Sequence, residues 1–222
     1  MARPVPRLFL VRHGRTDIPL TPRGVEQVKA QASALVGEGR PVDPKNICFA
    51  FVSPRIRAHK TFHLLFEHLP KLPDHTITEE VREWDYGDYE GLVTRDILSK
   101  DPGWDIWKHG CPGGESAEEM QHRVDCVIFK IRDHHRKWFE KGEGNRDVLV
   151  VAHGHFNRCL IARWNNFALT AGILPSMYYS ITDPKTGNNF NVEPGGVAVL
   201  SYNHHTLDEP ALDGLNLYAH AK

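Results

Sequence analysis

The chain has 222 residues and a formal net charge of −1, from 27 Lys and Arg against 28 Asp and Glu. This length suits one α/β domain, or a core domain with a small insertion, and is long enough to bury a substantial core. The nearly balanced charge argues against a nucleic-acid-binding or polybasic membrane surface, so any anion must be bound by local clusters of Arg and His.

Cysteine use and hydropathy indicate the compartment. The four cysteines (Cys48, Cys111, Cys126 and Cys159) form no C-x-x-C pair, which favours free or buried thiols in a reducing compartment. No apolar stretch approaches the ~20 residues that span a bilayer, and the apolar segment near the first residues is too short for a secretory signal. We therefore expect a soluble, cytoplasmic protein.

The first part of the chain alternates predicted strands and helices. An apolar run at 8–11 predicts a buried strand that leads directly into Arg-His-Gly at 12–14, where the glycine indicates a tight turn. Thr-Pro at 21–22 is typical of a helix start. Residues 47–52 predict a second buried strand, which Ser-Pro at 53–54 ends. The helix that follows has an apolar face of Ala58, Thr61, Phe62, Leu65, Phe66 and Leu69.

Residues 70–115 differ in character. They are rich in Pro, Gly, Trp and charge, and only residues 76–78 suggest a short strand. We interpret this segment as an insertion over the strand ends that serves as a lid or specificity element.

The last part of the chain returns to regular elements. A capping box at 116–119 predicts a long helix, whose histidines at 134–135 lie on its polar, solvated side. Residues 148–152 predict a buried strand that leads into His-Gly-His at 153–155 and a further helix. Residues 196–202 predict a last strand.

This alternation predicts a three-layer α/β/α sandwich with a mostly parallel central sheet and an insertion over the carboxyl ends of the strands. We expect a single domain over residues 1–222, with 70–115 as the insertion. Because the carboxyl ends of parallel strands share one edge of a sheet, the two strand-His-Gly units should converge on one pocket.

The residues at these strand ends suit a phosphoryl group. The guanidinium groups of Arg12 and Arg57 can hold phosphate oxygens through paired hydrogen bonds. A neutral imidazole, such as that of His13 or His153, can donate a hydrogen bond or attack phosphorus. A nearby carboxyl group can protonate the leaving alcohol, and Glu83 is the natural candidate.

Four motifs occur in this order: V-R-H-G, S-P-R-x-R-A-x-x-T, R-E-W-x-Y-G-x-x-E-G and A-H-G-H. Together they resemble those of the histidine phosphatase (phosphoglycerate mutase-like) superfamily, over nearly the whole chain. The resemblance implies that His13 becomes phosphorylated, that Glu83 is the general acid, and that the phosphate is held by Arg12, Arg57 and His153.

A closer resemblance is carried by residues 82–91, 104–107, 195–197 and 201–205. These residues resemble the fungal sedoheptulose-1,7-bisphosphatase subgroup, which implies that Tyr86 and His204 contact the substrate. We also assign Arg15 and Thr16 to substrate binding. One departure affects this segment: in the family a polar loop separates R-H-G from T-D-x-P-L-T, whereas here Gly14 adjoins Arg15. Either the site is trimmed and more open, or this sequence omits a loop, and we favour the omission.

Metal chemistry is the alternative to covalent catalysis. His153, His155, Asp17 and Asp147 are possible ligands, but no H-E-x-x-H motif accompanies them, and two arginines beside the histidines would repel a cation. We therefore expect no metal ion and no cofactor.

The resulting prediction is a phosphatase that hydrolyses a sugar bisphosphate, first of all sedoheptulose 1,7-bisphosphate, through a phosphohistidine. The alternatives are a broad-specificity or fructose-bisphosphatase-type enzyme, a phosphoglycerate mutase and, last, a non-enzymatic module that binds phosphorylated ligands. The second phosphate would need donors such as His204, Tyr86 and an arginine (Arg15 or Arg95). The predicted partner is a small phosphorylated sugar, not nucleic acid or membrane, and a homo-oligomer is left open.

Overall fold

A computed structural model of the chain describes residues 3–14, 19–169 and 186–219. Within them, one sheet has the strand order β3-β2-β4-β1-β5-β6. β1 pairs in parallel with β4, and β2 in parallel with β4 and β3, whereas β5 and β6 add antiparallel strands on the β1 side. The strands are β1 (Leu8–Arg12), β2 (Ile47–Val52), β3 (His75–Ile77), β4 (Asp147–Ala152), β5 (Val197–Tyr202) and β6 (Pro210–Leu217).

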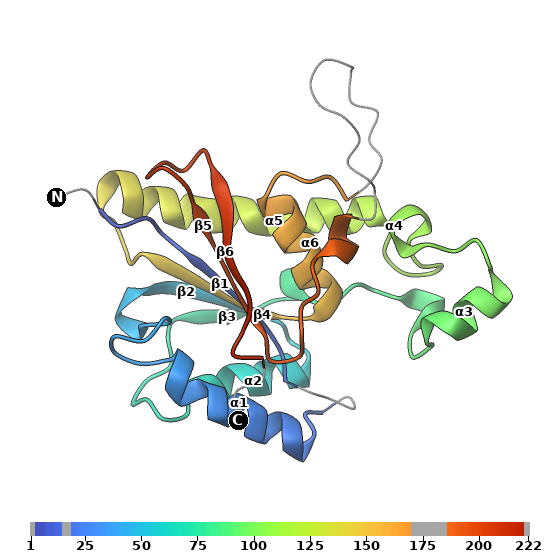
Figure 1. Cartoon of the computed structure of the whole chain (residues 1–222), viewed down its shortest axis with the longest axis horizontal. Coiled ribbons are helices and arrows are strands. Elements are labelled where there is room, and N and C mark those ends of the chain that lie inside the picture. Colours follow the sequence, from blue (N-terminus) through green and yellow to red (C-terminus); the bar gives the residue numbers. More distant parts are fainter. Residues whose placement is uncertain (1–2, 15–18, 170–185, 220–222) are drawn as a thin grey trace.

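Helices cover both faces of the sheet (Figure 1). α1 (Pro22–Leu35) and α2 (Ile56–Phe66) pack on one face, and α5 (Ala117–Arg136) and α6 (Gly154–Trp164) on the other. Successive residues of β4 alternate between the two cores: Val150 belongs to the core that includes α5 and α6, and Val151 to the one that includes α1 and α2. A strand buried on both faces is apolar throughout. The predicted three-layer, mostly parallel α/β fold is confirmed.

The pairing of β1 with β4 brings the two strand-His-Gly units together. Arg12 lies opposite Ala152 in the parallel register. The backbone N–H of His13 donates to the carbonyl of Ala152 at 3.1 Å. His13 and His153 therefore leave the same edge of the sheet from neighbouring strands, where ligands bind in sheets of this kind.

Two helices begin where their sequence predicts. The side chain of Thr21 accepts a hydrogen bond from the N–H of Gly24 at 3.0 Å, and Pro22 takes the first helical position. Ser116 and Glu119 form a capping box in which each side chain accepts from the backbone N–H of the other, at 3.1 and 2.8 Å. These caps satisfy N–H groups that have no partner within the helix.

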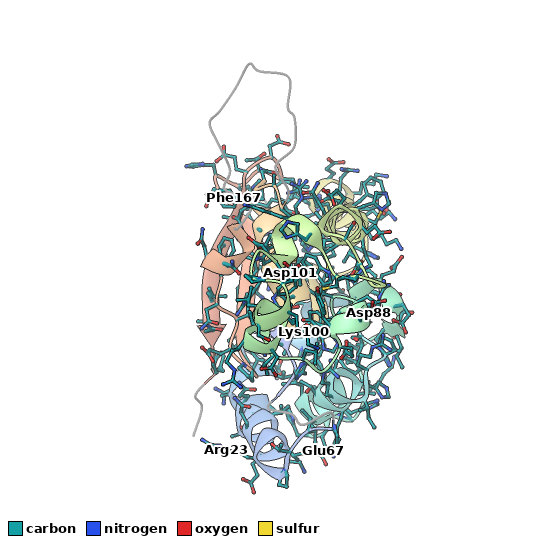
Figure 2. All side chains as sticks on the ribbon, turned by 90° about the vertical axis from the view of Figure 1, so that its right-hand side faces the viewer. Arg23, Glu67, Asp88, Lys100, Asp101 and Phe167 are labelled. Carbon is teal, nitrogen blue, oxygen red and sulfur yellow. The ribbon has the colours of Figure 1, made fainter. Side chains whose placement is uncertain are left out.

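Much of the segment 70–115 lies beyond the carboxyl ends of the parallel strands. It contains β3, α3 (Thr94–Lys100) and α4 (Ile106–His109). Figure 1 shows α3 and α4 past the edge at which β1, β2 and β4 end, and Figure 2, which faces this edge, shows Lys100 and Asp101 in front of the sheet. This is the place predicted for the insertion, and its role as a lid or specificity element stays a prediction.

The C-terminal strands differ from the prediction. The strand predicted at 196–202 corresponds to β5, which runs antiparallel to β1, but it is not the last strand, because β6 follows it. β6 has no counterpart in the prediction, because Pro210, Gly214 and Asn216 are residues more typical of turns, and Asn216 has a positive φ of 56°. An edge strand tolerates such residues, because one side of it forms no ladder.

His135 is buried, so the solvated position predicted for it is wrong. It is 0% exposed, packs against Trp164 and Tyr202, and places Nδ1 2.9 Å from the hydroxyl of Tyr202. The physical reason is its spacing: His135 lies one helical turn after Ile131, on the core stripe of α5. Burial disfavours the imidazolium and lowers the pKa of His135 to about 3.

We expect this burial to make the protein acid-labile. The unfolded chain protonates His135 near the ordinary pKa of 6.5, whereas the folded chain does so only near 3. Above pH 6.5 the histidine is neutral in both states and does not affect the free energy of unfolding. As the pH drops from 6.5 towards 3, the unfolded chain gains a proton that the folded chain does not, and the free energy of unfolding falls by ~1.4 kcal/mol per pH unit for each such histidine. Urea unfolding at several pH values measures the slope. His135→Phe should reduce the loss between about pH 6 and pH 5 by ~1 kcal/mol, whereas His63→Gln, at an exposed position, should not. Equal slopes in the two variants would contradict the expectation.

Two further observations concern the helices and the cysteines. Among the described residues, no helix is both long enough and apolar enough to cross a membrane. Cys48, Cys111, Cys126 and Cys159 are free thiols.

Candidate active site

His13 is buried at the end of β1 with a defined protonation state. Nδ1 lies 2.7 Å from the carbonyl oxygen of Gly14, which only accepts, so Nδ1 carries the proton. Nε2 lies 3.3 Å from Nε of Arg57, which only donates, so Nε2 keeps its electron pair. Burial lowers the pKa of His13 to about 4; the Gly14 carbonyl opposes this shift, and the charges of Arg57 and Arg12 add to it. The imidazole is therefore neutral at pH 7.

His153 supplies a second neutral imidazole. Its ring centroid lies 5.0 Å from that of His13. Its Nε2 lies 2.7 Å from the hydroxyl of Ser53, while its buried Nδ1 has no hydrogen-bond partner among the described residues. Burial lowers the pKa of His153 to about 3. Since buried polar atoms are nearly always paired, Nδ1 is suited to a ligand.

Two arginines flank the histidines. Arg57 lies in the first turn of α2, directly after the Ser-Pro break that ends β2. Arg12 ends β1 and donates from Nη1 to the carbonyl of Val192, while its buried Nε has no partner within the described part of the chain. A Cβ at Gly154 would lie 3.3 Å from Cζ of Arg12, so a side chain there would crowd the guanidinium. The glycine of the second strand-His-Gly unit therefore leaves room for Arg12.

Glu83 is held at the start of α6. Its carboxylate accepts hydrogen bonds from the backbone N–H groups of Trp84 at 3.0 Å, His155 at 3.2 Å and Phe156 at 2.9 Å. Burial alone would raise the pKa of Glu83, but the imidazoles of His153 and His155 and these N–H donors outweigh burial and lower it. The carboxylate is thus ionised and aimed at the same strand end as the two histidines.

A cavity of about 890 Å³ adjoins this cluster, between the insertion and α6. The side chains of His13, Arg57 and His153 are not in its wall. The two sites meet at His155, whose N–H binds Glu83 and whose Nδ1 lies 2.7 Å from the hydroxyl of Tyr86. The cluster therefore suits a small anionic group, and the cavity the remainder of a larger molecule. Its wall includes Tyr86, Tyr89, Trp104, Trp107, His155 and Arg158.

His204 does not join this site. β5 runs antiparallel to β1, with Leu200 opposite Leu8, so the residues after β5 lie near the start of β1 rather than its end. The side chain of His204 is 81% exposed and pairs with Glu209 at 2.6 Å. The structure therefore does not bring His204, the predicted substrate contact, to this site. The reason is the direction of β5, which the local motif does not reveal.

The other predicted contacts have different outcomes. Tyr86 is in the cavity wall, as described above. Arg15 and Thr16 lie outside the described residues. The side chain of Arg95 is 90% exposed, and its Nε lies 3.4 Å from Oδ1 of the neighbouring Asp96. Arg95 is not in the cavity wall.

Of the side chains proposed for the metal alternative, Asp17 lies outside the described residues, and Asp147 lies away from His153 and His155. Asp147 begins β4, at the far end of the strand from His153, and is neutralised there by Arg7 and Arg146. Across residues 3–14, 19–169 and 186–219, no cluster of three or more His, Cys, Asp or Glu side chains suits a metal ion.

Sequence reasoning missed Arg158 and Ser53. Arg158 lies on α6 in the cavity wall, with a buried Nε that has no partner among the described residues. Burial lowers the pKa of Arg12; Glu83 opposes this shift and the nearby charge of Arg158 adds to it. The signal for Arg158 is its place in the second turn of the helix that follows His153. Ser53 orients His153, and its signal is its position at the end of β2.

Comparisons with known proteins agree with this geometry. The sequence profile of the histidine phosphatase superfamily (branch 1) matches residues 8–205. The sedoheptulose 1,7-bisphosphatase of Saccharomyces cerevisiae is 33% identical over 254 aligned positions, covering 94% of this chain and 92% of the yeast protein. An acid phosphatase of Mycobacterium tuberculosis is 37% identical over 178 positions, covering 75% of this chain and 79% of that protein.

A solved structure supports the same relationship. The structure of an open reading frame from Mycobacterium tuberculosis superposes with a TM-score of 0.73 at 28% sequence identity, covering 96% of this chain and 98% of that one. The alignment with the yeast protein, at 254 positions, is longer than the 222 residues of this chain, so the yeast protein has segments that this chain lacks.

Proposed function

Because the chain belongs to the histidine phosphatase superfamily (branch 1) and is a metal-independent phosphomonoesterase, we propose that it hydrolyses a sugar bisphosphate, with sedoheptulose 1,7-bisphosphate as the first candidate. The observation that carries the chemistry is the state of His13. Its Nδ1 donates to a carbonyl, so Nε2 keeps an electron pair, which accepts a hydrogen bond from Nε of Arg57. A neutral, positioned imidazole is a competent nucleophile.

The first half-reaction transfers the phosphoryl group to His13. Nε2 attacks phosphorus, the P–N bond forms and the ester P–O bond breaks. The proton on Nδ1 stays in place, and the Gly14 carbonyl stabilises the positive charge that develops on the ring. Arg12, Arg57 and Nδ1–H of His153 hold the phosphoryl oxygens, whose charge must be stabilised in the transition state.

Glu83 protonates the leaving alcohol. In the substrate-free protein its carboxylate is ionised, held by backbone N–H groups of α6. The negative charge of a bound phosphate opposes that ionisation, so we expect substrate binding to raise the pKa of Glu83 and load it with a proton. Glu83 then gives this proton to the leaving oxygen as the P–O bond breaks.

The second half-reaction restores the enzyme. Water attacks the phosphorus of the phosphohistidine, Glu83 takes one of its protons, and the P–N bond breaks with its electron pair returning to Nε2. The products are inorganic phosphate and the neutral imidazole. Splitting the reaction in this way replaces one difficult displacement by two easier ones.

The adjoining cavity supports a large, hydrophilic leaving group with a second anion. Aromatic walls such as Trp104 can pack against a sugar, and Arg158 brings a guanidinium with a buried, unpartnered Nε in the described structure. A second phosphate bound by Arg158 would position the reacting end, so its contribution should affect turnover as well as affinity.

A panel of phosphosugars tests the proposal. We expect kcat/KM for sedoheptulose 1,7-bisphosphate and fructose 1,6-bisphosphate to exceed that of the matched 1-phosphates by roughly 100-fold, because a site built for the second phosphate is left unpaired by a monophosphate. Arg158→Met should remove most of that preference while changing the rates of the monophosphates little. Equal rates across the panel would contradict the bisphosphatase assignment.

One alternative has a specific observation behind it. A broad-specificity phosphatase would fit the wide cavity and the 37% identity to the mycobacterial acid phosphatase. The same panel separates the two, because a broad enzyme would also accept non-sugar phosphates at similar rates. A mutase would convert 3-phosphoglycerate to 2-phosphoglycerate without releasing phosphate, so adding 3-phosphoglycerate to the panel and measuring both products distinguishes it.

A further inference from the structure

A buried ion pair lies behind the segment that carries Glu83. Arg123 of α5 donates to both carboxylate oxygens of Glu115, from Nε at 2.7 Å and from Nη2 at 2.6 Å. The side chains are 11% and 5% exposed. Neither residue is in the wall of the cavity.

The guanidinium of Arg123 also binds the backbone around Glu83. Nη1 donates to the carbonyls of Glu80 at 3.1 Å and Arg82 at 3.0 Å, and Nη2 reaches the carbonyl of Glu83 at 3.4 Å. One side chain thus ties α5 to three peptide units that end at Glu83. A guanidinium can do this because its donors form a rigid fork.

Glu115 binds the chain just beyond Glu83. Its carbonyl accepts from the indole N–H of Trp84 at 2.9 Å, and its backbone N–H donates to the carbonyl of Asp85 at 2.9 Å. Its carboxylate also accepts from the N–H of Asp85 at 3.4 Å. The pair therefore holds residues 80–85 on both sides of Glu83.

This arrangement is more than packing requires. A buried ion pair contributes little net stability compared with apolar residues of the same volume. Here the pair fixes the backbone of Glu83 from the side of α5, while the N-terminus of α6 fixes its carboxylate from the other side. A proton donor must lie within hydrogen-bond reach of the leaving oxygen, and a misplacement of about 1 Å costs a large part of the rate.

We propose that Arg123 and Glu115 are positioning residues for the proton transfer, acting by holding the backbone of Glu83 so that its carboxyl group reaches the leaving oxygen. This inference rests on the proposed phosphatase mechanism and assigns a role to residues that touch neither phosphate nor sugar. It makes a specific claim: loss of the pair should impair phosphoryl transfer from substrates whose leaving group needs a proton, and spare transfer from substrates whose leaving group does not.

The test compares two leaving groups in Arg123→Lys. Lysine keeps the charge beside Glu115 but cannot bind the carboxylate and three carbonyls together. Glycerol 2-phosphate releases a strongly basic alkoxide that must be protonated, whereas p-nitrophenyl phosphate releases a stable phenolate. We expect kcat/KM, which reports phosphoryl transfer and not the later hydrolysis of the phosphohistidine, to fall by ~30-fold for the first and by less than ~3-fold for the second. Glu83→Gln should show the same selectivity, and the double variant should lose no more than Glu83→Gln alone.

Arg163→Lys is the matched control. Arg163 of α6 binds both oxygens of Asp125 on α5, at 2.8 and 3.0 Å, so it joins the same two helices away from Glu83. Arg163→Lys should lower kcat/KM for both substrates alike and by less than ~3-fold. Glu115→Gln, which keeps the shape of the partner, is the second variant if Arg123→Lys does not fold, and is expected to show the same selectivity.

The outcomes separate the positioning role from the proposed substrate. Equal losses on both substrates in the Arg123 and Glu115 variants, or an additive double variant, would overturn the positioning role. Glu83→Gln without leaving-group selectivity would overturn it too, because Glu83 would then not be the proton donor. If the variants show leaving-group selectivity but the wild-type protein shows no preference for bisphosphates, the positioning role stands and only the sugar-bisphosphate assignment is rejected.

Discussion

Replacing His13 by alanine is expected to lower kcat by roughly 10,000-fold or more, because alanine has no electron pair to form the bond to phosphorus. The loss is measured with p-nitrophenyl phosphate. The covalent intermediate is measured separately, by rapid denaturation after mixing with radioactively labelled substrate. Wild-type protein should retain a label that is labile in acid and stable in alkali, as a phosphohistidine is, and the alanine variant should retain none.

The control for this experiment is another histidine. His204 is exposed, pairs with Glu209 and lies at the opposite edge of the sheet. His204→Ala should therefore change kcat by less than about twofold. Label on the His13→Ala protein would contradict the covalent mechanism, and a large loss in His204→Ala would show that His204 contributes to the reaction despite its position.

The centre of the site could be predicted because its information is local. The short apolar runs before His13 and His153, each ended by His-Gly, are typical of strands buried on both faces, and parallel strands expose their carboxyl ends at one edge. The Ser-Pro break places Arg57 at the same edge of the sheet, because β2 ends and α2 starts within a few residues of it. Each of these placements follows from a few consecutive residues.

The parts that could not be predicted depend on long-range geometry. The direction of β5 decides the position of His204, yet the residues of a buried strand look the same in both directions. Arg158 and Arg123 lie on helices whose orientation follows from packing, and each acts on residues distant in sequence. The spacing of His135 to Ile131 indicates the buried face of α5. Its polar neighbours in the sequence indicate the opposite, so the sequence alone does not decide its position.

Replacing Arg57 by methionine is expected to lower kcat/KM by roughly 1,000-fold, because the guanidinium both holds Nε2 of His13 in place and neutralises charge on the transferred phosphoryl group. Methionine keeps much of the length and the apolar stem of arginine, so helix α2 should form as before. Arg57→Lys should recover only part of the loss, because an ammonium group cannot replace paired donors. Initial rates with p-nitrophenyl phosphate measure these effects.

The pH dependence gives a second, independent readout of Arg57. The pKa of His13 is about 4, mainly through burial and further through the charges of Arg57 and Arg12. Protonation removes the nucleophile, so kcat/KM of the wild-type protein should fall only below about pH 4. Without the charge of Arg57 the imidazolium of His13 is disfavoured less. The acidic limb of the pH profile, where kcat/KM falls, should therefore move to higher pH, while burial keeps it below the ordinary pKa of 6.5.

Arg55→Met is the matched control. Arg55 is exposed and its Nη2 lies 3.6 Å from Glu79, and the substitution removes the same charge from the same helix start. It should leave both the rate and the limb nearly unchanged. A limb that stays in place in Arg57→Met, or that moves equally in Arg55→Met, would show that the guanidinium of Arg57 does not control the protonation of His13.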